Sequence, residues 1–226
     1  MVAELMMSAS ASAACRSAVA RPDSRHLVIV GAGVMAACLA RAYAALFPDL
    51  DRVSIWARRP EQAKALVARL ELPGGVSLRT AADLQAALAD ADIISSATMA
   101  KEPVVPGEWV RAGTHVDLVG AYLPGMREAD DRLMAAASVY VDHRDTTRAI
   151  GEIARPVASG AVAADYVLGD LYDLAGMSGP ARGSAEEITV FKNGGGAHLD
   201  LMIAAYIAEI HADRRRLEAG TESPSL

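Results

Sequence analysis

The sequence predicts an α/β fold built on a doubly wound parallel sheet, and two observations support this prediction. Short apolar segments alternate with helical ones between residues 26 and 142, and such alternation implies parallel strands joined by right-handed crossovers. The first apolar segment also runs directly into a glycine-rich turn that opens a helix, in the stretch His26-Leu27-Val28-Ile29-Val30-Gly31-Ala32-Gly33-Val34-Met35-Ala36. With 226 residues, 52% of them hydrophobic, the chain is long enough to bury such a core.

The first half of the chain supplies four strands of the predicted sheet. The helix after the glycine turn runs to about Leu46, because Phe47-Pro48-Asp49 ends it. Pro60 lies in the first turn of the next helix, a position that proline favours. In chain order we expect a strand at 52–57, a helix at 60–70, a strand at 76–79, a short helix at 81–88 and a strand at 92–96.

The second half continues the same alternation. A strand at 115–120, a helix near 127–136 and a strand at 138–142 would complete a six-strand sheet. Residues 145–176 predict a helical, alanine-rich stretch. The last part predicts a strand at 186–191, a turn at Gly194-Gly195-Gly196 and a helix from about 197 to 217.

Composition excludes several classes of partner. The formal net charge of −6 argues against nucleic acid or an anionic membrane, and no apolar run is long enough to span a bilayer. We therefore expect a small-molecule ligand, no nucleic acid and no membrane. The two cysteines, Cys15 and Cys38, match no metal or redox spacing, so we expect no metal and a cytoplasmic location.

The glycine turn has the pattern of a dinucleotide-binding site. Gly31 permits a tight exit from a buried strand, Gly33 has no Cβ to block a pyrophosphate, and Ala36 lets the helix lie close to the sheet. Free N–H groups at the start of the helix then face the phosphates. The sequence therefore predicts a Rossmann NAD(P)-binding domain rather than a turn without a ligand, and its cofactor contacts in this turn are Gly31, Ala32, Gly33, Val34 and Met35.

The end of the second strand indicates which dinucleotide binds. An acidic residue there favours NAD, because it meets the ribose hydroxyls. This chain has no such acid and offers Ala57-Arg58-Arg59, and arginine forks match the geometry of a phosphate. We predict that Arg58 and Arg59 bind a 2′-phosphate, so that NADP(H) is preferred and NAD(H) is possible. The alternative is that both arginines are solvated surface charges.

The loop after the fourth strand lies where ligand crevices form in such sheets, at the carboxyl ends of the strands. We expect Ala97, Thr98 and Met99 to contact the cofactor. Lys101 is a candidate catalytic acid or anchor for a substrate carboxylate, and the alternative is an exposed, solvated lysine.

The later loops add further candidates. Val119 and Gly120 should border the nicotinamide, and Tyr122 either donates a proton or simply packs. We also count Asp142 and Lys192 among the cofactor contacts. Lys192 precedes the triple glycine, which suggests a backbone passing close to a ligand, although a glycine-rich turn before a helix explains the same pattern.

Taken together, these motifs resemble the ornithine cyclodeaminase and mu-crystallin family. The segments that match in order are Val30-Gly31-Ala32-Gly33-Val34-Met35-Ala36, Ala91-Asp92-Ile93-Ile94, Ala97-Thr98, Glu102-Pro103-Val104, Gly113-Thr114-His115, Val119-Gly120-Ala121, Arg127-Glu128, Val141-Asp142 and Ile188-Thr189-Val190-Phe191-Lys192. The resemblance implies an NAD(P)-dependent enzyme that acts on an amino or imino acid. It also implies a homodimer, if the full substrate domain is present.

One departure from the family concerns the reaction. The cyclodeaminases carry a water-activating aspartate in the loop after the fifth strand, and the matching residue here is Tyr122. The segments 116–121 and 126–131 look closer to the cyclic ketimine reductases, which implies reduction of imino acids such as Δ1-pyrroline-2-carboxylate to proline. The alternatives are an ornithine cyclodeaminase that forms proline from ornithine, and a nucleotide-binding remnant with little turnover.

A second departure lies at the start of the chain. The family has an arginine-threonine pair that binds the substrate carboxylate, and Met7-Ser8 stands in its place. We therefore expect an N-terminally truncated member whose second, substrate and dimerisation domain is only a remnant. The expected parts are a connector helix at 1–21, the Rossmann domain at 22–178, a strand and helix at 179–217 that return to the substrate domain, and a disordered tail at 218–226.

Overall fold

A computed structural model describes residues 18–220 of the chain, with the side chains of only some residues in the last helix. The strands are β1 (His26–Val30), β2 (Arg52–Trp56), β3 (Ser77–Thr80), β4 (Ile93–Ser96), β5 (His115–Leu118), β6 (Ser138–Val141), β7 (Val167–Gly169) and β8 (Thr189–Lys192). The helices are α3 (Val34–Leu46), α4 (Pro60–Arg69), α5 (Leu84–Ala89), α6 (Asp131–Ala136), α7 (Arg144–Thr147), α8 (Gly151–Ala158), α9 (Leu171–Gly176) and α10 (Ala197–Gly220), with 3₁₀ turns at Pro73–Gly75 and Gly107–Trp109.

All the strands described belong to one parallel sheet. Its order is β3-β2-β1-β4-β5-β8-β6-β7, and every pairing in it is parallel. The chain winds outward from β1 through β2 to β3, then crosses back to β4 on the other side of β1. The predicted doubly wound α/β fold is therefore confirmed, and its strand order reverses between β1 and β4.

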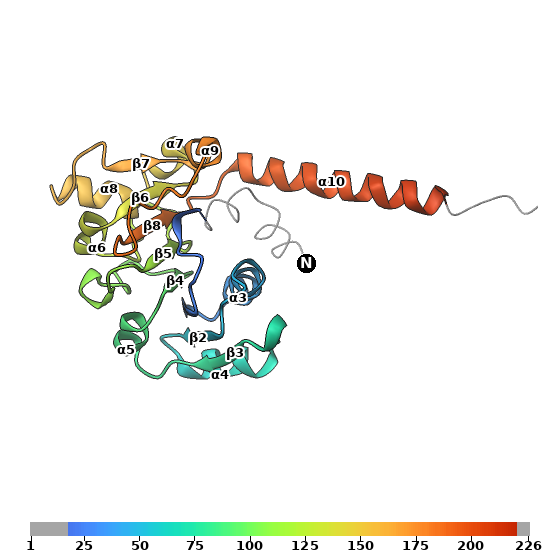
Figure 1. Cartoon of the computed structure of the whole chain (residues 1–226). Helices are drawn as coiled ribbons and strands as arrows, with labels where there is room; N and C mark the ends of the chain where they lie inside the picture. Colours follow the sequence, from blue (N-terminus) through green and yellow to red (C-terminus); the bar gives the residue numbers. More distant parts are fainter. Residues whose placement is uncertain (1–17, 221–226) are drawn as a thin grey trace, which may run out of the picture.

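Helices cover both faces of this sheet (Figure 1). Along β1, Leu27 and Ile29 belong to one buried cluster, which α3 and α4 complete. Val28 and Val30 belong to another, with side chains from α5, α6 and α8. Successive residues of a strand point to opposite faces, so an uninterrupted apolar strand is buried on both sides.

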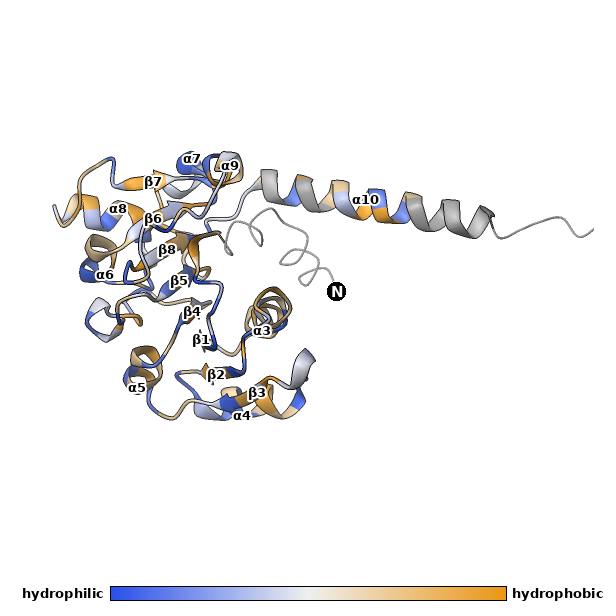
Figure 2. Cartoon of the chain, viewed as in Figure 1, coloured by the Kyte–Doolittle hydropathy of each residue, from blue (hydrophilic) through white to orange (hydrophobic). Residues whose placement is uncertain are grey.

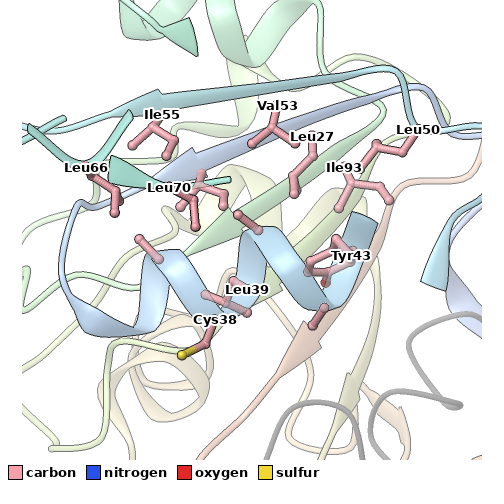
Figure 3. Close-up of a cluster of buried hydrophobic side chains, with 14 of the residues drawn as sticks. Leu27, Cys38, Leu39, Tyr43, Leu50, Val53, Ile55, Leu66, Leu70 and Ile93 are labelled. Carbon is pink, nitrogen blue, oxygen red and sulfur yellow. The ribbon is translucent and has the colours of Figure 1, made fainter. Parts of the chain in front are cut away.

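The first cluster fixes α3 against the sheet. Figure 3 shows Leu39 and Tyr43 of α3 beneath Leu27, Val53 and Ile93 of the strands. Leu39, Leu27 and Val53 are fully buried, and each such side chain contributes about 1.5–3 kcal/mol when it leaves water. This packing holds the start of α3, and thus the glycine turn, at the end of β1.

The sheet differs from the prediction in its number of strands. Within residues 18–220 it has eight strands rather than six, because β7 forms within the stretch expected to be helical and β8 also joins the sheet. We expected β8 to return to a second domain, but it lies between β5 and β6 and all its residues are buried. That strand therefore belongs to the Rossmann sheet, and the boundary drawn at residue 178 was wrong for it.

Two helices begin later than the sequence indicated. The carboxylate of Asp83 accepts a hydrogen bond from the backbone N–H of Ala86 at 2.9 Å, so α5 begins at Leu84 rather than at Ala81. The carboxylate of Asp130 accepts from Leu133 N at 2.8 Å, so α6 begins at Asp131 rather than near Arg127. In both cases an N-cap aspartate satisfies an N–H that the helix leaves open.

Helix α10 extends away from the sheet (Figure 1). Figure 2 shows hydrophobic segments along it, and Leu201 is 71% exposed. No helix within residues 18–220 is both long and apolar enough to cross a membrane. The connector helix predicted at 1–21 lies almost wholly outside the described residues. Of the disordered tail predicted at 218–226, residues 218–220 belong to α10 instead, and the rest lies outside the described residues.

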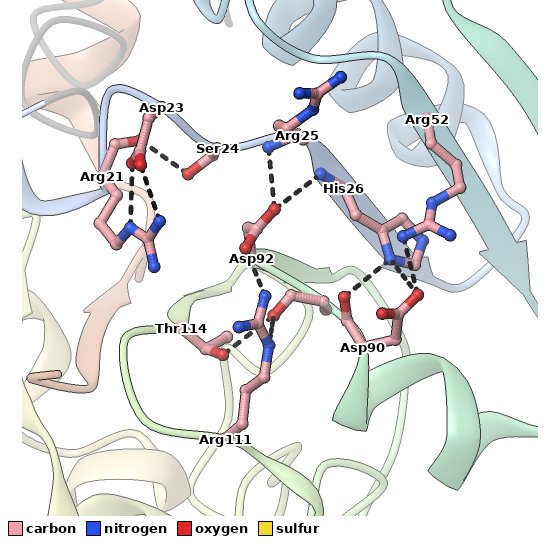
Figure 4. Close-up of polar contacts among 11 residues, drawn as sticks. Arg21, Asp23, Ser24, Arg25, His26, Arg52, Asp90, Asp92, Arg111 and Thr114 are labelled. Atoms are coloured by element: carbon pink, nitrogen blue, oxygen red, sulfur yellow. Dashed lines mark hydrogen bonds and ion pairs between the residues drawn. The ribbon is translucent and has the colours of Figure 1, made fainter. Parts of the chain in front are cut away.

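A polar network ties the amino ends of the strands together (Figure 4). The carboxylate of Asp92 accepts from the backbone N–H groups of Arg25 and His26 at 2.9 and 3.0 Å, and it pairs with Arg111. Asp90 pairs with Arg52 at 2.7 Å. These contacts fix the end of α5 against the start of β1 and β2.

His26 is held neutral in this network. Arg79 Nε donates to Ser54 Oγ at 3.2 Å, and Nε2 of the neutral His26 ring accepts from the Ser54 hydroxyl at 2.8 Å. Nδ1–H then donates to the carbonyl of Asp90 at 3.0 Å. Burial lowers the pKa of His26 below its ordinary 6.5, although the hydrogen bond to Asp90 opposes the shift.

The depressed pKa of His26 predicts a loss of stability in mild acid. As pH falls below the ordinary value of 6.5, the unfolded chain binds a proton that the folded chain resists, so the free energy of unfolding decreases. The variant His26→Gln should lose part of this slope. Urea unfolding between about pH 7.5 and about pH 5.5 measures it, and equal slopes in the two proteins would contradict the assignment.

Candidate functional site

A cavity of about 320 Å³ opens at the carboxyl ends of β1, β2 and β4. Its lining consists of Gly31, Ala32 and Gly33 after β1, Trp56, Ala57, Arg58, Arg59 and Gln62 around the end of β2, and Ala97, Thr98, Met99, Ala100 and Val104 after β4. This is the point where the strand order reverses, which is where ligands bind in open α/β sheets. The structure thus brings together the candidates from three separate loops.

The glycine turn has the geometry that a pyrophosphate needs. Gly31 has a φ of 122°, and a Cβ there would lie 2.8 Å from the carbonyl oxygen of Ala97, so a side chain is excluded. A Cβ at Gly33 would have nothing within 4 Å. Gly33 is also the N-cap of α3 without a side-chain cap, and the first N–H groups of a helix have no partner within it. Dinucleotide phosphates therefore fit this cradle.

The rim near β2 is cationic. Arg58 and Arg59 are exposed and line the cavity, and its lining among the described residues holds no carboxylate. Four further lining residues were not indicated by the sequence patterns: Trp56, Gln62, Ala100 and Val104. A contact of Gln62 with the cavity could have been predicted, because this residue lies in the first turn of the helix that follows Arg59.

The remaining turn and loop candidates lie around this cavity rather than in its lining. Val34 is 75% exposed at the start of α3. Met35 and Val119 pack against the first hydrophobic cluster. Gly120 approaches Thr98 so closely that a Cβ would lie 2.0 Å from its carbonyl oxygen, so the loops after β4 and β5 are in direct contact.

Asp142 and Lys192 are fully buried. The carboxylate of Asp142 accepts from Gly194 N and Gly195 N at 3.0 and 2.8 Å, and thereby fixes the glycine turn after β8. Lys192 Nζ donates to the carbonyl of Leu118 at 3.0 Å. Both side chains therefore hold loops at the carboxyl edge of the sheet, and a direct contact with a cofactor stays a prediction.

A buried group of charges lies under this edge. Burial lowers the pKa of Lys192, while Glu152 and then Glu128 oppose the shift. Burial raises the pKa of Glu152 to about 7, and Lys192 acts in the other direction. Glu128, whose role the sequence did not predict, is a fully buried carboxylate that accepts hydrogen bonds from the loops after β4 and β5.

The two catalytic candidates lie on exposed loops. Tyr122 is 52% exposed after β5, and Lys101 is exposed after β4. Their loops are joined where Arg127 N donates to the carbonyl of Ala100 at 3.0 Å. Both side chains are accessible to a substrate at this edge, and their roles stay predictions.

Comparison with known proteins places this chain in a family. Residues 4–214 match the model of the ornithine cyclodeaminase/mu-crystallin family. The chain belongs to this family. The match includes β1 through β8, so the sheet and crevice described above are those of an ornithine cyclodeaminase/mu-crystallin protein.

Known proteins are similar to this chain in sequence and in structure. The chain is 60% identical over 199 residues to the Δ1-pyrroline-2-carboxylate reductase of Paracoccus denitrificans, an alignment that covers 87% of this chain and 62% of that protein. The Δ1-pyrroline-2-carboxylate reductase of Thermococcus litoralis, in complex with NADH and L-proline, superposes with a TM-score of 0.84 at 28% identity, covering 99% of this chain and 68% of that one. An archaeal alanine dehydrogenase dimer with bound NAD gives 0.82 at 28% identity, covering 94% and 65%.

The two glycines of the turn should respond differently to a side chain. Gly31→Ala should lower the free energy of unfolding by about 1–3 kcal/mol, because its φ and the Ala97 carbonyl both oppose a Cβ. Gly33→Ser should change it by no more than about 0.5 kcal/mol, because serine suits an N-cap and its Cβ meets open space. Denaturant unfolding measures both values. Equal losses would show that Ala97 does not constrain the turn.

Proposed function

We propose that this chain is an NAD(P)H-dependent reductase that converts a cyclic imino acid, such as Δ1-pyrroline-2-carboxylate, to proline. The observation that carries the proposal is the crevice at the reversal of strand order, with its open glycine turn and cationic rim. The substrate class is inferred from the 60% identical reductase of Paracoccus denitrificans. The chain spans 62% of that protein's length, so the activity is proposed for the whole protein.

The residues of the chain have distinct parts in this proposal. Reduction of a C=N bond adds a hydride to carbon and a proton to nitrogen, and the dinucleotide supplies the hydride. The turn from Gly31 to Gly33 binds the pyrophosphate. The loops after β4 and β5 border the nicotinamide. Tyr122 or Lys101 delivers the proton, and Lys101 is also the candidate anchor for the substrate carboxylate. Both are exposed at the edge that the imino acid must approach.

Assembly and location form the rest of the proposal. The apolar side chains Leu201, Tyr206 and Ile210 are exposed on α10, which supports a homodimer. Light scattering of the purified protein gives the mass that decides this point.

Cys38 is a free, buried thiol, which fits a reducing cytoplasm, and fractionation of cells tests that location.

Turnover with a cyclic imine tests the proposed reaction. The protein should consume NADPH in the presence of Δ1-pyrroline-2-carboxylate and form proline, as measured by the fall in NADPH absorbance and by amino-acid analysis. Gly33→Val is the matched control, because its side chain fills the place of the pyrophosphate while its Cβ meets no atom within 4 Å. A protein that binds NADPH without turnover would instead be a nucleotide-binding protein.

Ornithine separates the proposal from the related deaminase. Because Tyr122 stands where deamination needs a carboxylate to activate water, the protein should release no ammonia from ornithine in the presence of NAD. An ammonia assay measures this. Release at a rate comparable to imine reduction would make ornithine deamination the better description.

Arg58 and Arg59 should favour NADPH over NADH. Replacing both with alanine should weaken NADPH binding by roughly 1.5–3 kcal/mol for each charge-assisted hydrogen bond that is lost, with little effect on NADH. Arg69→Ala is the control, because that exposed arginine ends α4 and does not line the cavity. Titration of nicotinamide fluorescence gives the affinities. Equal affinity of the unmodified protein for both cofactors would exclude the preference.

A further inference from the structure

Glu128 is a fully buried carboxylate that joins two loops of the crevice. Its Oε1 accepts from Ser96 Oγ at 2.6 Å and from both the backbone N–H and the hydroxyl of Thr98 at 2.7 Å. Its Oε2 accepts from Gly120 N at 2.6 Å and from Ala121 N at 3.3 Å. One oxygen thus holds the loop after β4, and the other holds the loop after β5.

A second carboxylate fixes the backbone of Glu128. Glu152, at the start of α8, is also fully buried, and it accepts from Glu128 N at 2.9 Å and from Ala129 N at 2.7 Å. A buried ionised carboxylate is costly unless its oxygens are satisfied. The five donors on Glu128 meet that requirement, so its carboxylate is a rigid attachment point.

The loops that Glu128 holds lie on one half of the crevice. Thr98 lines the cavity, and its Cγ2 lies 3.7 Å from the position of a Cβ on Gly31. In a doubly wound sheet the two halves of a dinucleotide lie on either side of the first strand. Because the cationic rim at Arg58 and Arg59 lies on the β2 side, the nicotinamide belongs over β4 and β5.

We propose that Glu128 is a positioning residue that sets the loops on which the nicotinamide half of the cofactor rests. It acts through Thr98 and Gly120 and does not touch the cofactor. The proposal rests on the proposed function only in requiring that the crevice bind a dinucleotide. It follows that changes at Glu128 should weaken binding of the nicotinamide half and spare binding of the adenosine half.

Binding of a cofactor and of its fragment tests this inference. NADPH is compared with 2′-phospho-ADP-ribose, the same molecule without its nicotinamide, by calorimetric titration of the protein and of Glu128→Gln. In the variant an amide N–H₂ must face a backbone N–H of one loop, since the glutamine offers only one acceptor oxygen. We expect the Kd of NADPH to rise about tenfold or more, whereas that of the fragment changes less than about twofold.

Asp130→Asn is the matched control. That carboxylate also joins two segments, since its Oδ1 accepts from Gly107 N and Leu133 N at 2.9 and 2.8 Å, but it does not line the cavity. It should leave the ratio of the two Kd values unchanged. Ser96→Ala, which removes one donor to Glu128, serves if Glu128→Gln does not fold, and it should raise the Kd of NADPH about threefold.

The outcomes separate this inference from the proposed function. If the unmodified protein binds neither NADPH nor the fragment, the proposed function fails. If it binds both and Glu128→Gln weakens both equally, or weakens neither, Glu128 does not position the nicotinamide half. Selective loss of NADPH binding in Glu128→Gln, with no change of the ratio in Asp130→Asn, supports the inference.

Discussion

Strand β1 forms hydrogen bonds with a strand on each side, and the crevice depends on this double pairing. Val30, its last residue, lies level with Trp56 of β2 and with Ser96 of β4. Because the three strands end together, the loops that follow them converge on one point. Gly31 then donates its N–H to the carbonyl of Trp56 at 2.8 Å, and Ala97 donates to the carbonyl of Val30 at 2.9 Å. The backbone itself closes the floor of the crevice.

The sequence predicted those parts of the fold that local patterns determine. The order of β1, the glycine turn and α3 follows from an apolar run, two glycines and a helical segment that are adjacent in the chain. These three elements also form the phosphate cradle of the crevice. N-cap aspartates are a local signal as well, and Asp83 and Asp130 would have corrected the starts of α5 and α6.

Contacts between distant segments were not predictable in the same way. β8 lies between β5 (residues 115–118) and β6 (residues 138–141), which therefore do not pair with each other. No pattern within residues 189–192 predicts this placement. Glu128 belongs to a segment that resembles the family, but its role was not predictable from the residue itself, because a single glutamate before a helix is typical of an exposed charge. Its role depends on a fold that brings Thr98 and Gly120 to the two sides of its carboxylate.

The late position of β8 in the chain has a consequence for how the protein folds. β8 is the last strand described, yet it separates β5 from β6, so β6 and β7 can join the rest of the sheet only after residue 192 has been synthesised. Until then β5 and β6 each present an unpaired edge, and such edges pair readily with other chains. Contacts between segments as distant as His115 and Thr189 also form slowly. The growing chain therefore passes through a stage at which these two strand edges are open to association with other chains.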